Sequence, residues 1–370
     1  MERREALSTL AGLGAASLLP ESFPHPVPSD SRGIRPSAGA QDQAIVVEGL
    51  IAGGLRLPHL RGQQAGGVHC GMASCPGEMN GWSRELKFLD TYNKEVVLAK
   101  SVADIRKARA DGRIAHVYGW QSADALGAAF NGTMGGVDTP LRAFYEMGLR
   151  SVGIAYNVAN VFGGGCLEPT TPLSRAGKRL VEEMHKMRIV LDVGGHTGEQ
   201  TSLDAIAITS GLPVVCSHTN VAAIADNPRC ISDRLIDAIA GTGGVIGLTA
   251  VNDFHVRGRR DADVKSSPRV GVDKYIEQFE YIRKRVGVDH IGLGPDFVDG
   301  MPLVYEAVNR EVITREMIGD GTWYYVKGFE SAAELPNVTA AFKARGWSQP
   351  DIDKVMGGNW LRVWSRIWGS

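Results

Sequence analysis

Short apolar runs and helical patterns alternate along this chain, and this alternation limits the fold more than any other feature. The apolar runs are rich in valine and isoleucine and fall at residues 45–50, 67–72, 114–119, 151–155, 189–193, 213–217, 245–249 and 290–294. Most are apolar at consecutive positions, as expected of strands that are buried on both faces. Amphipathic helical patterns lie between them, for example at 172–187, 232–240 and 272–286. The sequence therefore predicts an α/β fold, a parallel (β/α)₈ TIM barrel.

An open, doubly wound parallel sheet is the alternative fold for such an alternation. That fold usually places a glycine-rich phosphate loop and a helix directly after its first strand. Residues 49–54 read GLIAGG, which is rich in glycine but does not fit the pattern G-x-G-x-x-G, and no helical pattern is evident after it. The barrel is therefore preferred over the open sheet.

The first 40 residues differ from the rest and are predicted to be an export signal with a linker. Arg3 and Arg4 precede an uncharged stretch at residues 6–20, and residues 21–43 are rich in proline, serine and glycine. Paired arginines before an apolar run are typical of twin-arginine signals. We therefore expect a periplasmic or secreted protein with a single barrel domain at residues 41–370. A disordered cytoplasmic tail is the alternative for this segment.

Charge and hydropathy exclude some classes of partner. The 370-residue chain has a net charge of −1, so nothing in its overall charge indicates nucleic-acid binding. It has no run of 18 apolar residues, so no membrane span is expected.

The last part of the chain lacks strand signals. Residues 301–330 are predicted to form a long excursion that covers a site, with Trp323, Tyr324 and Tyr325 in it. Helices are expected near 340–345 and 349–356. The final segment, GGNWLRVWSRIWG, is predicted to be a helix packed across the outer wall of the barrel.

Polar side chains follow three of the predicted strands, at the end where barrel enzymes place their catalytic groups. His196 follows the fifth strand, His218 ends the sixth, and Asp296 follows the eighth. Imidazole nitrogens bind zinc and similar divalent ions, and a nearby carboxylate can deprotonate a bound water. A single histidine would more simply be structural, but two at successive strand ends favour a metal site. Arg229, after the sixth strand, could pair with a substrate carboxylate, although a surface arginine is the simpler interpretation.

Several segments resemble the membrane (renal) dipeptidase family, peptidase M19. They are DVGGHTGEQTSLDAI, PVVCSHTNVAAIADNPRCISDRLIDAIAGTGGVIGLTA, DHIGLGPDF and GGNWLRVW, in the family's order, and the resemblance spans roughly residues 44–368. It implies an amidohydrolase-like barrel that uses zinc to cleave dipeptides. It also implies that His196 and His218 bind one metal, that Asp296 assists proton transfer and that Arg229 holds the substrate carboxylate. Homodimers, common in the family, are expected by resemblance only.

The chain departs from the family at the other metal. The family's first strand normally ends in His-x-Asp, where this chain has Leu50 and Ala52, which cannot bind a metal. Tyr118 stands in place of the glutamate that normally bridges the two ions, and Tyr156 in place of a histidine that contacts substrate. Both tyrosines are therefore candidates for substrate binding. The resemblance implies a divergent bacterial branch with one divalent ion rather than two.

A third ligand for that ion would have to come from Asp296, His69, Cys70 or a water. These departures leave two main functions open. The first is a metal-dependent hydrolase that cleaves a dipeptide or a similar small amide with a metal-activated water. The second is a barrel that binds a small molecule without hydrolysing it, or that performs altered chemistry.

Overall fold

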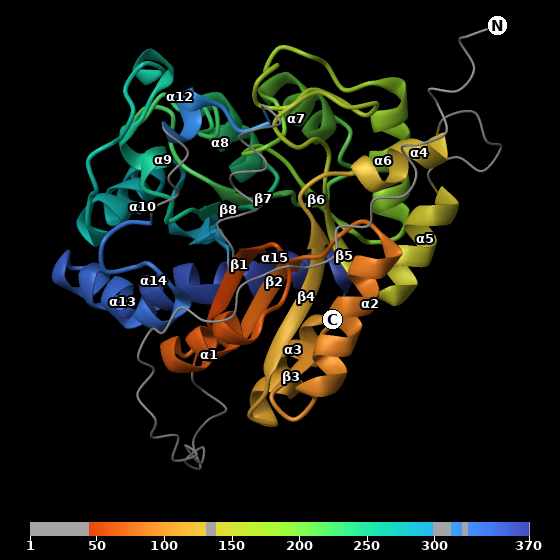
Figure 1. Ribbon diagram of the computed structural model, residues 1–370, viewed down its shortest axis with the longest axis horizontal. Coiled ribbons are helices and arrows are strands. Elements are labelled where there is room, and N and C mark those ends of the chain that lie inside the picture. The colour runs from red at the N-terminus through yellow and green to blue at the C-terminus, as the bar shows by residue number, and fades with distance from the viewer. Residues whose placement is uncertain (1–43, 131–137, 299–311, 320–324, 370) are drawn as a thin grey trace, which may run out of the picture. The chain divides into compact units, whose positions relative to one another are not determined.

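The computed structural model of the protein describes residues 44–130, 138–298, 312–319 and 325–369 (Figure 1). The predicted signal and linker at residues 1–40 lie outside these ranges, as do Trp323 and Tyr324 of the predicted lid. The strands are β1 Val47–Ala52, β2 Cys70–Ser74, β3 Val96–Leu98, β4 Ile114–Trp120, β5 Leu149–Gly153, β6 Val190–Asp192, β7 Val215–Thr219, β8 Val245–Leu248, β9 Ile291–Leu293 and β10 Phe297–Val298.

Helices follow most of these strands. They are α1 Leu57–Gly66, α2 Met79–Thr91, α3 Val102–Ala110, α4 Asp124–Phe130, α5 Asp138–Met147, α6 Arg175–Lys186, α7 Glu199–Ala207, α8 Asp233–Gly241, α9 Asp253–Val256, α10 Val272–Val286, α12 Arg315–Ile318, α13 Leu335–Ala344, α14 Gln349–Asp353 and α15 Asn359–Trp368. None of the described helices is both long enough and apolar enough to cross a membrane. The helix α1 begins five residues after β1. The interpretation that no helical pattern follows the first strand was therefore wrong.

The strands form a parallel barrel, which confirms the predicted fold class. Strands β1, β2, β4, β5, β6, β7, β8 and β9 are hydrogen-bonded in that order, each parallel to the next. The last strand is interrupted by Gly294, Pro295 and Asp296, and its continuation β10 pairs in parallel with β1. This interrupted strand therefore closes the ring. Each of the eight predicted strands overlaps one barrel strand, whereas β3, a three-residue strand beside β4, was not predicted.

Side chains that alternate along each strand divide between the barrel interior and the helix layer. On β4, Val117 packs in the apolar cluster that contains Val47 and Val215, whereas the next residue, Tyr118, packs against Trp82 of α2. The helix α6 buries the apolar face that its spacing predicts, and its Leu180 is fully buried. Each such side chain contributes about 1.5–3 kcal/mol relative to an exposed one.

The last helix, α15, covers the end of the barrel where the strands begin, and not its outer wall as predicted. Asn359 donates to the carbonyl oxygens of Val288 and Ile291, just before and at the start of β9. Arg366 donates to the carbonyl oxygen of Gly211, in the segment before β7. The indole of Trp360 lies within 3.0 Å of the positions that Cβ atoms would occupy at glycines of β1, β8 and β9, so it fits only because they lack side chains. The loops that carry the site residues lie at the other end of the barrel, after the carboxyl ends of the strands.

Candidate active site

The histidines, the aspartate and the arginine predicted from the sequence meet at the carboxyl ends of the strands. His196 follows β6, His218 is the fourth residue of β7, Arg229 lies in the loop after β7, and Asp296 lies between β9 and β10. All four side chains are at most 5% exposed. Loops at this end of a parallel barrel carry catalytic groups in barrel enzymes. The chain therefore brings together every predicted site residue of these three types.

His196 is placed by a tight turn of two glycines. Gly194 and Gly195 both have positive φ, at 74° and 59°, a conformation that favours glycine. A Cβ atom at Gly195 would lie 2.5 Å from the backbone oxygen of His218 and 2.8 Å from Nη1 of Arg229. The second glycine thus lets the loop approach the two other residues of the site closely.

The hydrogen bonds of His196 fix its tautomer. Asn157 donates through Nδ2 to the carbonyl oxygen of Val312, 2.6 Å away, which leaves its Oδ1 as the acceptor. That oxygen lies 2.6 Å from Nδ1 of His196, so Nδ1–H donates to it. The imidazole then presents the Nε2 lone pair to the site. Burial, together with the nearby Arg229 guanidinium, holds the pKa of His196 well below its usual range and keeps the ring neutral.

His218 lies beside His196 with its ring edge-on, and the two ring centroids are 4.7 Å apart. Nδ1 of His218 lies 2.7 Å from the hydroxyl oxygen of Ser217. Nε2 of His218 is buried and has no hydrogen-bond partner among the described residues. Burial, and after it the charge of Arg229, lowers the pKa of His218 well below its usual value. Two neutral imidazoles therefore meet in this site, and one of them has a nitrogen without a partner.

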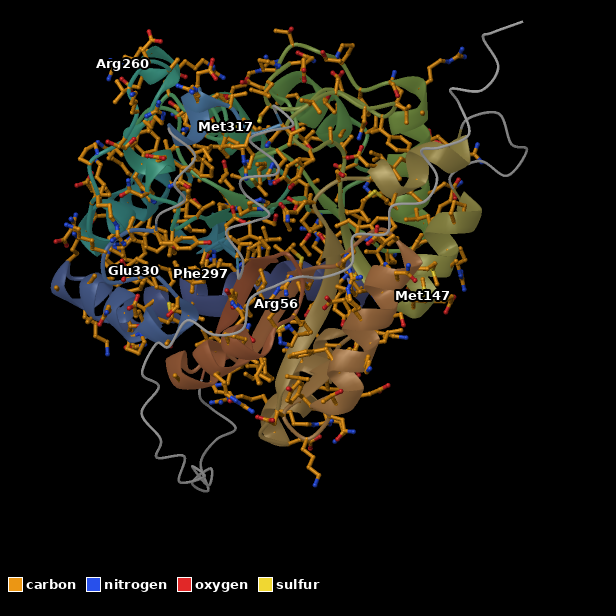
Figure 2. The ribbon with its side chains drawn as sticks, viewed as in Figure 1. Arg56, Met147, Arg260, Phe297, Met317 and Glu330 are labelled. Carbon is orange, nitrogen blue, oxygen red and sulfur yellow. The ribbon has the colours of Figure 1, made fainter. Side chains whose placement is uncertain are left out.

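Asp296 stands at the break in the last strand. Its backbone has a positive φ of 63°, and its carbonyl oxygen accepts a hydrogen bond from the hydroxyl of Tyr325. Phe297, labelled in Figure 2, packs edge-on against Tyr325 and Phe329 and anchors the segment. Burial raises the pKa of the Asp296 carboxyl to about 7, and Arg229 opposes this shift. A carboxyl with this pKa can take or release a proton near neutral pH.

Hydrogen bonds fix the backbone of Arg229, and part of its guanidinium has no partner among the described residues. Its backbone N–H donates to Oδ1 of Asn227, and its carbonyl oxygen accepts from the hydroxyl of Thr219. Nη2 lies 3.2 Å from Nε2 of His196, whereas Nη1 is buried with no partner among the described residues. A buried guanidinium nitrogen without an acceptor is a ready partner for a carboxylate.

The two predicted substrate-binding tyrosines have different surroundings. The ring of Tyr156 stacks on His196 with the centroids 3.9 Å apart, so Tyr156 belongs to the site. Tyr118 lies on the helix-facing side of β4, and its ring packs edge-on against Trp82 at 5.3 Å. This placement does not support a role for Tyr118 in substrate binding, because alternation along β4 turns its side chain away from the barrel interior.

Two further residues of the site were missed. Gln121, the first residue after β4, has Oε1 2.8 Å from Nε2 of His196, and Asn157 orients the same ring. Gln121 carried the signal used for the histidines, a polar residue directly after a strand.

The site has part of what a divalent ion requires. The ring centroids of His196 and His218, the two ligands predicted from the sequence, lie 4.7 Å apart. His69 accepts from the backbone N–H of Val46 at the start of the barrel, and Cys70 is buried in the apolar interior, so neither fits as a third. Within residues 44–130, 138–298, 312–319 and 325–369, no three His, Cys, Asp or Glu side chains are placed to hold one ion.

A parallel barrel with histidine, aspartate and arginine side chains at the carboxyl ends of its strands is typical of a barrel enzyme. Comparison with known proteins identifies the family. A family model of membrane dipeptidases, peptidase family M19, matches residues 85–318 and 310–368. The chain is 32% identical over 282 residues to an uncharacterized protein in the pqqA 5′ region of Klebsiella pneumoniae, covering 73% of this chain and 89% of that one. The chain belongs to the membrane dipeptidase family.

Other relatives agree with this assignment. Dipeptidase tcpJ of Claviceps purpurea is 25% identical over 280 residues, which cover 75% of this chain and 56% of that protein. A crystal structure of an amidohydrolase from Pseudomonas aeruginosa is 28% identical, with a TM-score of 0.76, over 88% of this chain and 97% of that one. A metallopeptidase from Rhodobacter sphaeroides, crystallised with a phosphinate mimic of L-Ala-D-Ala, shares the fold at 22% identity, with a TM-score of 0.68, over 88% of this chain and all of that one.

Proposed function

We propose that this protein is a metal-dependent hydrolase that cleaves a dipeptide or a similar small amide with a single divalent ion, zinc by family. The observation that carries the proposal is the pair of neighbouring imidazoles, with Nε2 of His218 unpartnered. Neutral imidazole is the form that binds metal, and burial keeps both rings neutral. The dipeptide mimic bound to the Rhodobacter sphaeroides metallopeptidase supports a substrate of this class.

The residues divide the work of amide hydrolysis between them. When bound at His196 and His218, the ion supplies Lewis-acid polarisation and lowers the pKa of water. Asp296 accepts the proton from the attacking water and returns it to the departing amine. Arg229 holds the substrate carboxylate through its unpartnered Nη1, and Tyr156 packs beside the reacting amide.

A non-hydrolytic binding barrel is the second candidate, and one observation favours it. Arg229 and Gln121 both lie within hydrogen-bond distance of Nε2 of His196, the atom that would bind the ion. A cationic guanidinium at that lone pair opposes a metal. In that case the pocket would hold a small carboxylate through Arg229, with no chemical step.

Metal content separates the two candidates. Protein purified without chelators or a histidine tag should contain about one zinc per chain and should hydrolyse simple L,L- and L,D-dipeptides. Elemental analysis together with an amine-release assay measures both quantities. Protein that stays free of metal after incubation with zinc, manganese or cobalt would contradict the hydrolase and leave the binding barrel.

The role of Arg229 predicts a selective loss. The variant Arg229→Ala should raise KM for a dipeptide about 10- to 100-fold, since a hydrogen bond to a charged group contributes about 1.5–3 kcal/mol. A dipeptide amide, which lacks the carboxylate, should lose no further affinity in the variant. The control is Arg259→Ala, which removes an exposed arginine paired with Asp226. Equal losses for acid and amide substrates would count against the carboxylate role.

Two expectations from the sequence are also part of the proposal. The arginine pair and apolar run within residues 1–20 support export by the twin-arginine route to the periplasm or outside the cell. Family resemblance supports a homodimer. Signal cleavage in a bacterial host and the mass of the protein in solution would test them.

A further inference from the structure

A cavity lies beside the candidate active site, at the carboxyl ends of β2 and β4. Its volume is about 230 Å³, far more than a single water occupies. Two of the residues that line it, Gln121 and Tyr156, also contact His196. Oε1 of Gln121 lies 2.8 Å from Nε2 of His196, and the ring of Tyr156 stacks on the imidazole with the centroids 3.9 Å apart. The cavity therefore adjoins the candidate active site at this imidazole.

This cavity and Arg229 lie on opposite sides of His196. The strands of this part of the barrel follow the order β2, β4, β5, β6 and β7, and His196 follows β6. The cavity is lined by residues at the ends of β2 and β4 and by Tyr156, which follows β5, whereas Arg229 follows β7. A substrate that pairs its carboxylate with Arg229 and passes along His196 therefore extends toward the cavity.

The lining of the cavity has an apolar part and one charge. Trp120, Ala125 and Cys75 contribute apolar surface. Asp124 is the only charged residue among the described residues that line it, and its side chain is exposed. A cavity of this kind is complementary to a group that carries both an apolar side chain and a positive charge.

The carboxylate of Asp124 is held in place by two neutral donors. The hydroxyl of Ser122 donates to Oδ2, and Nδ2 of Asn160 donates to Oδ1, each at 2.7 Å. The amide of Asn160 is itself fixed, because its Oδ1 accepts from the backbone N–H groups of Phe162 and Gly163. Neither donor balances the negative charge, so an oriented carboxylate faces the cavity with its charge available to a cation.

We propose that this cavity binds the amino-terminal residue of the substrate, with the carboxylate of Asp124 paired with the α-ammonium group and the apolar part of the lining against the side chain. The inference rests on the proposed function for its class of substrate, a dipeptide, although it requires no metal. Arg229 and Asp124 bind the two opposite charges of the dipeptide, on either side of His196. Substrates with a free amine are therefore preferred over N-acyl substrates.

A dipeptide and its N-acetyl derivative test this assignment in the variant Asp124→Asn. The variant should raise KM for leucyl-alanine about fivefold, the upper end for an exposed ion pair, and leave KM for N-acetyl-leucyl-alanine unchanged. The matched control is Asp233→Asn. Asp233 is the first residue of α8, as Asp124 is of α4, but it pairs with Arg285 in the helix layer. The control removes the same charge from the same helix position and should leave both KM values unchanged.

Equal changes in KM for the two substrates, or no change in either, would overturn the assignment and leave Asp124 the structural role of ordering the start of α4. If the wild type binds both compounds without cleaving them, the proposed function fails, and the same comparison is made with Kd values from calorimetry. A wild type that binds neither compound contradicts both proposals. Thermal unfolding of each variant shows that a change in affinity does not come from a loss of folding.

Discussion

The variant His218→Ala should lose its divalent ion and lower kcat/KM for a dipeptide by about a thousandfold. The reason is that Nε2 of His218 is the one imidazole nitrogen of the site without a partner among the described residues. Alanine removes that ligand, and the ion would keep too few protein ligands to stay bound. Lewis-acid catalysis contributes several kcal/mol, and about 4 kcal/mol corresponds to a factor of a thousand. Elemental analysis gives the metal content per chain and steady-state hydrolysis gives kcat/KM, both on the same preparation.

The matched control is His185→Ala, on the helix α6 in the outer layer of the barrel. It should keep both the ion and the activity. A His218→Ala variant that keeps one ion per chain and more than a tenth of its activity would show that the imidazole is structural. Protein without the ion in both wild type and variant, together with unchanged ligand binding, would support the binding barrel instead.

The barrel was predictable because its signal is repeated. Each apolar run is short, and eight of them occur between helical patterns, so an error in one boundary leaves the topology unchanged. The strand β3 was missed because three residues, Val96–Leu98, are too few to show a period. The helix α15 was predicted but misplaced, since the two tryptophans Trp360 and Trp364 show that a face is buried without showing against what.

The site was predictable where one rule applied, that polar groups after parallel strands meet at the same end. This rule located His196, His218 and Asp296. Tyr118 was predicted from the family resemblance instead and was wrong, because alignment with a family motif ignores the alternation of side chains along a strand. One residue of shift turns a side chain from the barrel interior to the helix layer. Asn157 could not have been found, since its contact with His196 depends on a loop conformation with a φ of 59°.

Asp296 gives the second large effect, and its sign follows from its pKa. Burial raises the pKa of this carboxyl to about 7, and a bound cation would lower it, so the midpoint should lie at or below about 7. A general base works only when deprotonated. The wild-type kcat/KM should therefore fall about tenfold for each pH unit below this midpoint and be constant above it.

The variant Asp296→Asn should lose this acid limb and lower kcat by about a hundredfold to ten-thousandfold, the range found for general bases. Stability should move in the opposite direction. Because the pKa is higher in the folded state than the ordinary value near 3.8, the free energy of unfolding falls as pH rises from about 4 to 7, and the buried charge costs stability above that. Asparagine carries no such charge, so the variant should be at least as stable as the wild type at pH 8. A pH–rate profile and denaturant unfolding at pH 5 and pH 8 measure both effects, and a variant that keeps the acid limb would assign that proton to another group.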